Sequence, residues 1–196
     1  MKNITKLVLL FVITLASCNP NVRISEDVEG NGSVIKEKRA ITDNFDKIIA
    51  TSGINVFVTQ STTNQVEVET DENLMKYVVA KVENGILMVK LEGNVSFMST
   101  INIYVSGASF TGLKATGDAT ITTKNLLSGN LIDIQTVNGS QITANLEFSK
   151  VNCQASKGST IIVSGKAKQF YTNFSSGGEI DSSKLEAAEI LEQPLN

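Results

Sequence analysis

The chain has 196 residues, a formal net charge of −3 at pH 7, and neither histidine nor tryptophan. Its mildly acidic balance of 17 basic against 20 acidic residues argues against a nucleic-acid-binding protein. The lack of histidine removes the usual general base and the commonest metal ligand, so we expect no cofactor and no metal site.

The N-terminus has the pattern of a bacterial lipoprotein signal. Lys2 and Lys6 flank the start of an apolar run over residues 7–15, and Ala16-Ser17 supplies small residues directly before Cys18. The run is too short to span a bilayer, which takes about 20 apolar residues. We therefore predict a signal peptide over residues 1–17 and lipidation of Cys18. The alternative is an ordinary secretory signal that leaves Cys18 as a free thiol.

Lipidation would place the protein on a membrane. In sequences of this kind the cysteine receives a diacylglycerol and the new amino group is usually acylated, for example with palmitate. Two acyl chains already give stable anchoring. Residues 18–32 are polar and contain Pro20, Gly30 and Gly32, which is typical of a flexible tether. In some bacterial lipoproteins an acidic cluster next to the cysteine resembles a signal for export to the cell surface. No such cluster follows Cys18, which favours the periplasmic side of the outer membrane over the cell surface.

Removal of the signal peptide also changes charge and cysteine content. The remaining chain has 15 basic and 20 acidic residues, a net charge of −5. With Cys18 lipidated, Cys153 has no partner and no disulfide can form. Packing and backbone hydrogen bonds must therefore hold the domain together.

Beyond the tether the hydrophobic pattern has a period of two. Residues 54–58, 66–69 and 101–105 alternate apolar with polar or mixed side chains, as half-buried strands do. Asn84-Gly85 between two apolar runs predicts a β-hairpin, because both residues tolerate positive φ. Residues 71–77 suggest a short helical turn.

The second half of the chain repeats. Gly139, Gly158 and Gly177 are 19 residues apart, and Gly117 stands 22 residues before the first of them. Apolar and small residues keep the same register in four columns: Ile132, Val151 and Phe170; Ile134, Cys153 and Thr172; Thr136, Ala155 and Phe174; Ile142, Ile161 and Ile180. This pattern predicts an all-β parallel β-solenoid, or β-helix, with about 19–22 residues per coil. An irregular β-sandwich is the alternative, because short strands with regular turns can imitate a repeat.

Several segments resemble a known family. They are residues 45–48, 51–60, 66–74 and 82–87, with Gly53-Ile54-Asn55 as the characteristic triplet, and weaker Gly-Ser-like corners at 106–109, 138–140 and 157–159. Together they resemble the head GIN domain of putative auto-transporter adhesins, from about Ser33 to about Ser183. The resemblance implies an exported, right-handed, single-stranded β-helix, common as a lipoprotein in Bacteroidetes-like bacteria.

The C-terminus departs from this pattern. Residues 184–196 lose the Gly-Ser rhythm, and Leu185, Ala188 and Leu191 follow a helical spacing after residues 181–183, which are suitable N-caps. One interpretation is a short segment that caps the open end of the sheet. The other is an irregular, incomplete last coil. We therefore predict that the solenoid domain covers residues 33–183.

No catalytic constellation stands out. Parallel β-helices that degrade polysaccharides need clustered carboxylates on one outer face. The acidic residues of the repeats lie instead on different columns: Asp118, Asp133, Glu147, Glu179 and Asp181. Glu67 and Glu69 share a strand face, which is typical of a solvated side. We predict no catalytic residues and a protein that is not an enzyme, with a polysaccharide-degrading enzyme as the least favoured alternative.

The repeat register points to one candidate binding surface. If Ile132, Ile134 and Thr136 face inward, two polar columns face outward: Asp133, Asn152 and Tyr171, and beside them Gln135, Gln154 and Asn173. Amides and an aromatic ring on a rigid sheet suit sugar hydroxyls or the polar edge of another protein. The alternative is an amide ladder that only stabilises the stacked coils. Cys153 is expected inside as a small core residue.

Two classes of function fit these features. The first is a membrane-tethered adhesion or binding module for a glycan, an envelope component or a partner protein. The second is a purely structural envelope lipoprotein that associates with itself through the ends of its solenoid.

Overall fold

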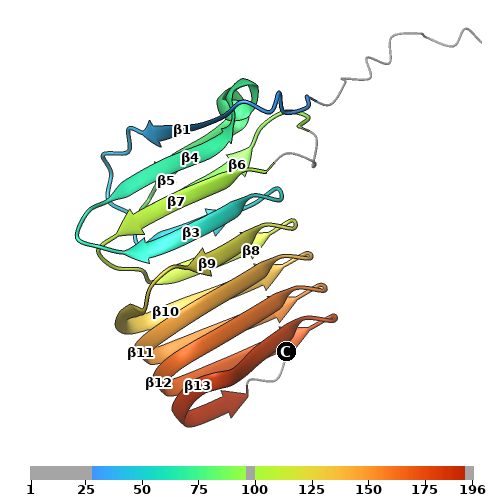
Figure 1. Ribbon diagram of the computed structural model, residues 1–196. Coiled ribbons are helices and arrows are strands. Elements are labelled where there is room, and N and C mark those ends of the chain that lie inside the picture. The colour runs from blue at the N-terminus through green and yellow to red at the C-terminus, as the bar shows by residue number, and fades with distance from the viewer. Residues whose placement is uncertain (1–27, 96–99, 193–196) are drawn as a thin grey trace, which may run out of the picture.

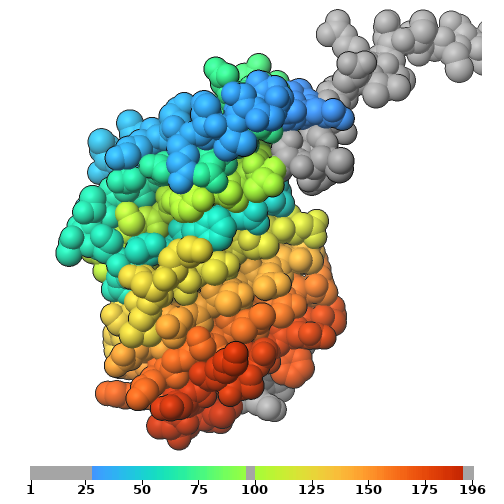
Figure 2. All heavy atoms as spheres, viewed as in Figure 1, coloured from blue at the N-terminus to red at the C-terminus, as the bar shows by residue number. Residues whose placement is uncertain are grey.

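The computed structural model describes residues 28–95 and 100–192. Over these residues the chain forms 13 β-strands and a 3₁₀ helix, η1 (Glu72–Tyr77). The strands stack one upon another along the molecule (Figure 1), and their side chains fill successive layers (Figure 2). The predicted signal peptide, Cys18 and most of the predicted tether lie outside the described residues. No helix of the described part is long and apolar enough to cross a membrane.

Two walls of sheet enclose the core. Wall A begins with the strands β1 (Val34–Arg39), β4 (Gln65–Asp71), β7 (Asn102–Gly107), β3 (Asn55–Gln60) and β9 (Thr120–Thr123). Wall B begins with β5 (Val78–Glu83), β6 (Ile86–Leu91), β2 (Lys47–Ala50) and β8 (Gly112–Thr116). Four longer strands complete the molecule: β10 (Leu127–Val137), β11 (Gln141–Ser156), β12 (Thr160–Ser175) and β13 (Glu179–Glu192). The start of β11 extends wall A beside β9, and the end of β10 extends wall B beside β8.

The strand pairing confirms the predicted parallel β-solenoid. Ile132 pairs with Val151 and Val151 with Phe170, and Ile142 pairs with Ile161 and Ile161 with Ile180. The other two predicted columns also stack residue on residue. Nearly all of their side chains are buried between the walls, so each coil buries its apolar face on the coils next to it.

One inward position was predicted wrongly. Phe174 was expected inside with Thr136 and Ala155, yet it is 56 % exposed, whereas Thr136 is 0 % and Ala155 2 % exposed. The reason is the length of the next coil. β13 reaches Glu192, which pairs with Thr172, so no described strand lies beyond that point to cover Phe174.

Tight corners join wall B to wall A in each coil. Two successive residues with positive φ form every corner: Ser52-Gly53, Gly117-Asp118, Asn138-Gly139, Lys157-Gly158 and Ser176-Gly177. The corners bond to one another along the stack, since Gly139 N donates to Lys157 O (3.2 Å) and Gly158 N to Ser176 O (3.2 Å). The recurring glycines of the sequence therefore mark a left-handed backbone conformation, as their spacing indicated.

The N-terminal part has antiparallel additions to the solenoid. Asn84 (φ 51°) and Gly85 (φ 78°) form the predicted hairpin turn between β5 and β6. β1 and β4 also pair antiparallel, at the end of wall A. The helical turn predicted over residues 71–77 is η1, which buries Leu74 and Met75. Together these elements cover the N-terminal end of the core.

The predicted C-terminal boundary is wrong. Residues 184–192 are not a helical cap; they continue β13, which pairs in parallel with β12 as far as Glu192, with one irregularity in its register. A register shift between Ile162 and Ser164 explains the lost rhythm. Ile161 pairs with Ile180, 19 residues on, whereas Ser164 pairs with Lys184, 20 residues on. The extra residue breaks the sequence period while the ladder continues. Residues 193–196 lie outside the described part.

Candidate binding pocket on the outer face of wall B

The two predicted polar columns lie on the outer face of wall B. Asp133 pairs with Asn152 and Asn152 with Tyr171, and in the neighbouring row Gln135, Gln154 and Asn173 stack in the same way. The alternation of the strands places these side chains outward, opposite the buried Ile134 and Cys153. The structure thus brings all six residues together as predicted, while their binding role stays a prediction.

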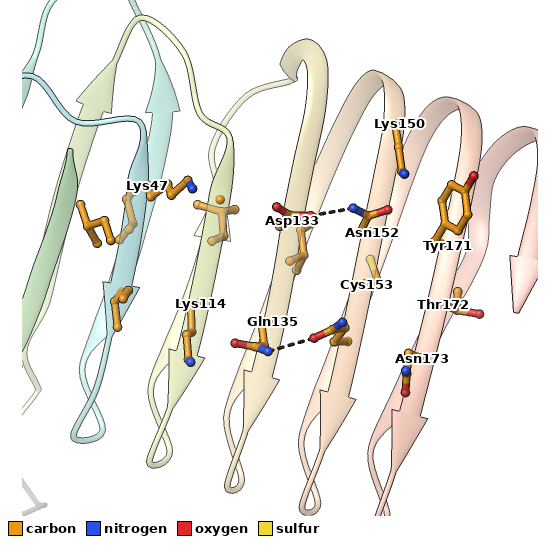
Figure 3. Close-up of a pocket in the computed structure, with 17 residues that line it drawn as sticks. Lys47, Lys114, Asp133, Gln135, Lys150, Asn152, Cys153, Tyr171, Thr172 and Asn173 are labelled. Atoms are coloured by element: carbon orange, nitrogen blue, oxygen red, sulfur yellow. Dashed lines mark hydrogen bonds between the residues drawn. The ribbon is translucent and has the colours of Figure 1, made fainter. Parts of the chain in front are cut away.

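A pocket of about 460 Å³ is centred on these residues. All six line it, and strands β2, β8 and β11 add further side chains (Figure 3): Lys47, Ile49, Lys114 and Lys150. We call this hollow the wall-B pocket. Its polar lining contains three lysines and one aspartate, so its charge is positive on a chain whose net charge is negative.

Gly112 lies at the base of the pocket, on β8 between β2 and β10. It pairs with Lys47 on one side and with Asp133 on the other. Because Gly112 has no side chain, the Lys47 stem lies across it, and a Cβ at that position would meet Lys47 Cγ at 3.2 Å. The Lys47 side chain consequently runs from β2 toward β8 (Figure 3).

Two hydrogen bonds link the polar columns across β10 and β11. Asn152 Nδ2 donates to Asp133 Oδ1 (2.6 Å), and Gln135 Nε2 donates to Gln154 Oε1 (2.9 Å). These two bonds belong to the amide ladder that we gave as the alternative to a binding surface. The ladder stops there, because the described residues give Asn173 no side-chain hydrogen bond and Tyr171 only the ammonium group of Lys150, 4.3 Å from its ring centroid. One oxygen of Asp133 and one of Asn152 stay open to the pocket.

Cys153 lies behind the pocket as a core residue. Its side chain is 1 % exposed, and burial raises the pKa of its thiol to about 12. A thiol that stays protonated at neutral pH is not a nucleophile. The prediction that Cys153 is a small core residue is confirmed.

Sequence reasoning missed a second polar cluster, on the outer face of wall A. Glu69 accepts hydrogen bonds from Asn102 Nδ2 (2.9 Å) and Tyr104 Oη (3.2 Å) and pairs with Lys36 Nζ (3.1 Å). The Tyr104 ring stacks on Phe57 with centroids 5.2 Å apart. Glu69 is therefore no solvated residue, and the bonds from Asn102 and Lys36 lower its pKa.

No sequence signal pointed to this wall-A cluster. It joins β1, β4 and β7, and two of its strand pairs are antiparallel. The repeat of the second half does not reach these strands, so it could not align their residues. The polar groups of the cluster bond to one another across three strands, which stabilises the contact between these strands.

Acidic residues of the repeats do not gather into a catalytic or metal-binding group. Within residues 28–95 and 100–192, no three Cys, Asp or Glu side chains are close enough to hold a metal ion. Among the described residues, Asp133 is the one carboxylate that lines the wall-B pocket.

Comparison with known proteins identifies what the chain is similar to. Residues 44–191 match the family model described as putative auto-transporter adhesin, head GIN domain. No curated protein matches the chain at a significant level.

Solved structures share the fold at low sequence identity. A putative adhesin from Bacteroides fragilis is 18 % identical with a TM-score of 0.75, over 86 % of this chain and 80 % of its own. A putative adhesin from Parabacteroides merdae is 20 % identical with a TM-score of 0.61, over 87 % and 81 %. A protein from Parabacteroides distasonis described as a putative lipid binding protein is 17 % identical with a TM-score of 0.66, over 86 % and 81 %.

Proposed function

Because the chain belongs to the head GIN domain family of putative auto-transporter adhesins, we propose that it is an exported, membrane-anchored module that binds a glycan, an envelope component or a partner protein. The observation that carries this proposal is the convergence of both polar columns on one pocket. The module is non-catalytic, since the described part of the chain places a single carboxylate in its pocket and the sequence contains no histidine. Turnover of any glycan in a polysaccharide panel would contradict this.

The anchor of the proposed module is the lipid on Cys18. The support is the signal pattern at the N-terminus, and the tether gives the domain reach from the membrane. Radiolabelled palmitate fed to cells should enter the chain and should be absent from a Cys18→Ser variant. A labelled variant, or an unlabelled wild-type chain, would overturn the anchor. Protease added to intact cells should spare the protein if it faces the periplasm, as we propose, and degrade it if it faces outward.

The binding surface is tested by removing its side chains. The triple variant Asp133→Ala, Asn152→Ala, Tyr171→Ala keeps the buried columns and removes one outward column. The matched control Gln141→Ala, Thr143→Ala, Thr160→Ala removes outward side chains from wall A of the same coils. Each full mature chain, held in detergent, is applied to glycan, lipid and envelope-protein panels; lipids are included because one structural neighbour is described as lipid binding.

We expect the wall-B triple variant to lose binding that the wall-A control retains. Equal binding by both variants would exclude the wall-B pocket as the binding surface. Circular dichroism with thermal melting checks that both variants are folded.

Self-association is the second candidate function. β13 pairs with β12 alone among the described strands, and Ile190 on it is 62 % exposed. An unpaired sheet edge with apolar side chains can pair with another chain. Sedimentation velocity over a range of concentrations tests this candidate. Assembly that Ile190→Lys abolishes would support it, and a single species that stays monomeric at high concentration would exclude it.

A further inference from the structure

Two lysines of the wall-B pocket, Lys47 and Lys114, are not held by an ion pair with any described residue. Lys36, Lys81, Lys90 and Lys166 each pair with a glutamate within 4.0 Å. Lys47 and Lys114 have no such partner in the described part of the chain, although Asp133 lines the same pocket. With Lys150, three cations and one carboxylate line the same hollow, and this excess of positive charge can attract an anion.

Both amines arise from neighbouring strands of one wall. Lys47 lies opposite Gly112 on β8, and Lys114 comes two residues after Gly112 on the same outward face. Adjacent strands are about 4.8 Å apart, so the two stems start within reach of one small group. Lys114 is half-buried, which reduces the loss of side-chain freedom on binding. In Figure 3 the two amines point apart, so a carboxylate that contacts both requires one of these flexible lysine side chains to turn toward the other.

The opposite side of the pocket has a different chemistry. The rungs between β10 and β11 use one atom of each side chain, which leaves Asp133 Oδ2, Asn152 Oδ1, Gln135 Oε1 and Gln154 Nε2 open to a ligand. Three of these atoms are acceptors and suit hydroxyl donors. The Asp133 carboxylate would repel a polyphosphate or a nucleic acid. The ligand must therefore combine one anionic group with hydroxyl groups.

We propose that the wall-B pocket binds an acidic saccharide, whose carboxylate lies at Lys47 and Lys114 and whose hydroxyls bond to Asp133, Asn152 and the glutamine pair. This inference rests on the proposed binding function and names its ligand class. The volume of about 460 Å³ falls within the range of small-ligand sites. The Lys150–Tyr171 pair forms one edge of the site and limits where the sugar ring lies.

The test compares acidic sugars with neutral counterparts. The full mature chain in detergent is titrated by calorimetry with oligogalacturonate, its fully methyl-esterified form, sialyllactose and lactose. We expect each acidic probe to bind at least about tenfold more tightly than its neutral counterpart, as a charged hydrogen bond of about 1.5 kcal/mol gives. The preference should decrease as salt is raised.

The lysines are tested by a double variant and a matched control. Lys47→Gln with Lys114→Gln should remove the preference for the acidic probe. Lys38→Gln with Lys168→Gln changes the net charge equally at exposed positions outside the pocket and should retain the preference. Equal melting temperatures show that the variants are folded.

The results distinguish the proposed acidic-saccharide ligand from the proposed binding function of the wall-B pocket. If neutral sugars bind as tightly as acidic ones and the Asp133, Asn152, Tyr171 triple variant still loses binding, the ligand class is wrong and the binding surface stands. If acidic sugars bind equally to the triple variant, both proposals are wrong. An acidic preference that survives Lys47→Gln, Lys114→Gln would also overturn the inference.

Discussion

At the scale of the residue, the same charged side chain has different roles on the two walls. Glu69 on wall A bonds to residues of β1 and β7 at once and is 23 % exposed. Asp133 on wall B bonds to one amide and is exposed to the pocket. Satisfied carboxylates stabilise the fold, whereas those with open acceptor atoms are available to a ligand.

The Glu69→Gln substitution should destabilise the protein in a pH-dependent way. Asn102 and Lys36 lower the pKa of Glu69 from 4.5, so the folded chain holds the ionised form better than the unfolded chain. That stability is complete above pH 4.5 and is lost as pH falls through the lowered native pKa. We expect a loss of about 1–2 kcal/mol in the free energy of unfolding at neutral pH, measured by urea denaturation.

The control for Glu69 is a surface pair. Glu83 bonds to Lys81 (2.6 Å) at an exposed position, so Glu83→Gln should have a smaller effect. The Glu69→Gln and wild-type curves should converge in acid, where both side chains are neutral. A constant difference from neutral to acid pH would show that the charge of Glu69 is not what stabilises the fold.

The Cys153 thiol should be unreactive in the folded protein. Burial raises its pKa to about 12, so only a small fraction is thiolate at neutral pH, and the side chain is 1 % exposed. Labelling with a thiol-specific reagent should be slow under native conditions and complete in denaturant, as mass spectrometry would show. Fast labelling of the folded chain would contradict the inward position of Cys153.

At the scale of the element, each coil depends on close packing at its tight corner. Ser140 and Ser159 follow two of the corners and are buried; Ser140 Oγ donates to Ala115 O (2.8 Å) and Ser159 Oγ to Ser156 O (2.7 Å). Gly178 holds the equivalent place in the last coil. The two hydroxyls satisfy backbone carbonyls inside the corner, whereas Gly178 has no room for a side chain.

Gly178→Ala should therefore cost more than Gly158→Ala. A Cβ at Gly178 would lie 2.7 Å from Ser156 N and closer still to the Ala155 carbonyl, so the backbone must move. Gly158 has φ +67° with open space around it, so alanine there adds backbone strain alone. We expect losses of about 3 kcal/mol and about 1 kcal/mol. Urea denaturation measures both, and equal losses would show that the corner of the last coil can adjust.

At the scale of the whole molecule, the sequence predicts what repeats and misses what does not. The 19-residue spacing aligned Asp133 with Asn152 and Tyr171, because parallel coils stack like residues on like. Lys47 and Lys114 escaped prediction since β2 and β8 lie outside that period. The wall-A cluster depends on antiparallel pairs, which no spacing encodes.

The C-terminal end shows the same limit. One extra residue between Asp181 and Lys184 changed the spacing from 19 to 20, and the sequence then suggested a helix where the ladder continues. Period analysis detects a coil only while its length is constant. A bulge leaves its extra residue unpaired while the ladder continues on both sides, and the changed spacing hides the coil from the sequence period.

The stability of the solenoid should fall toward its C-terminal end. β11 pairs with β9, β10 and β12, and β12 pairs with β11 and β13, whereas β13 pairs with β12 alone among the described strands. In a linear array each coil is stabilised by its neighbours, so a coil with one neighbour opens at a lower free energy. Native-state hydrogen exchange should therefore show amide protection that is highest in β11 and lowest in β13. Equal protection in β11 and β13 would mean either that the molecule unfolds as one unit or that a second chain covers the β13 edge. A rise in β13 exchange on dilution would show that a second chain covers the edge.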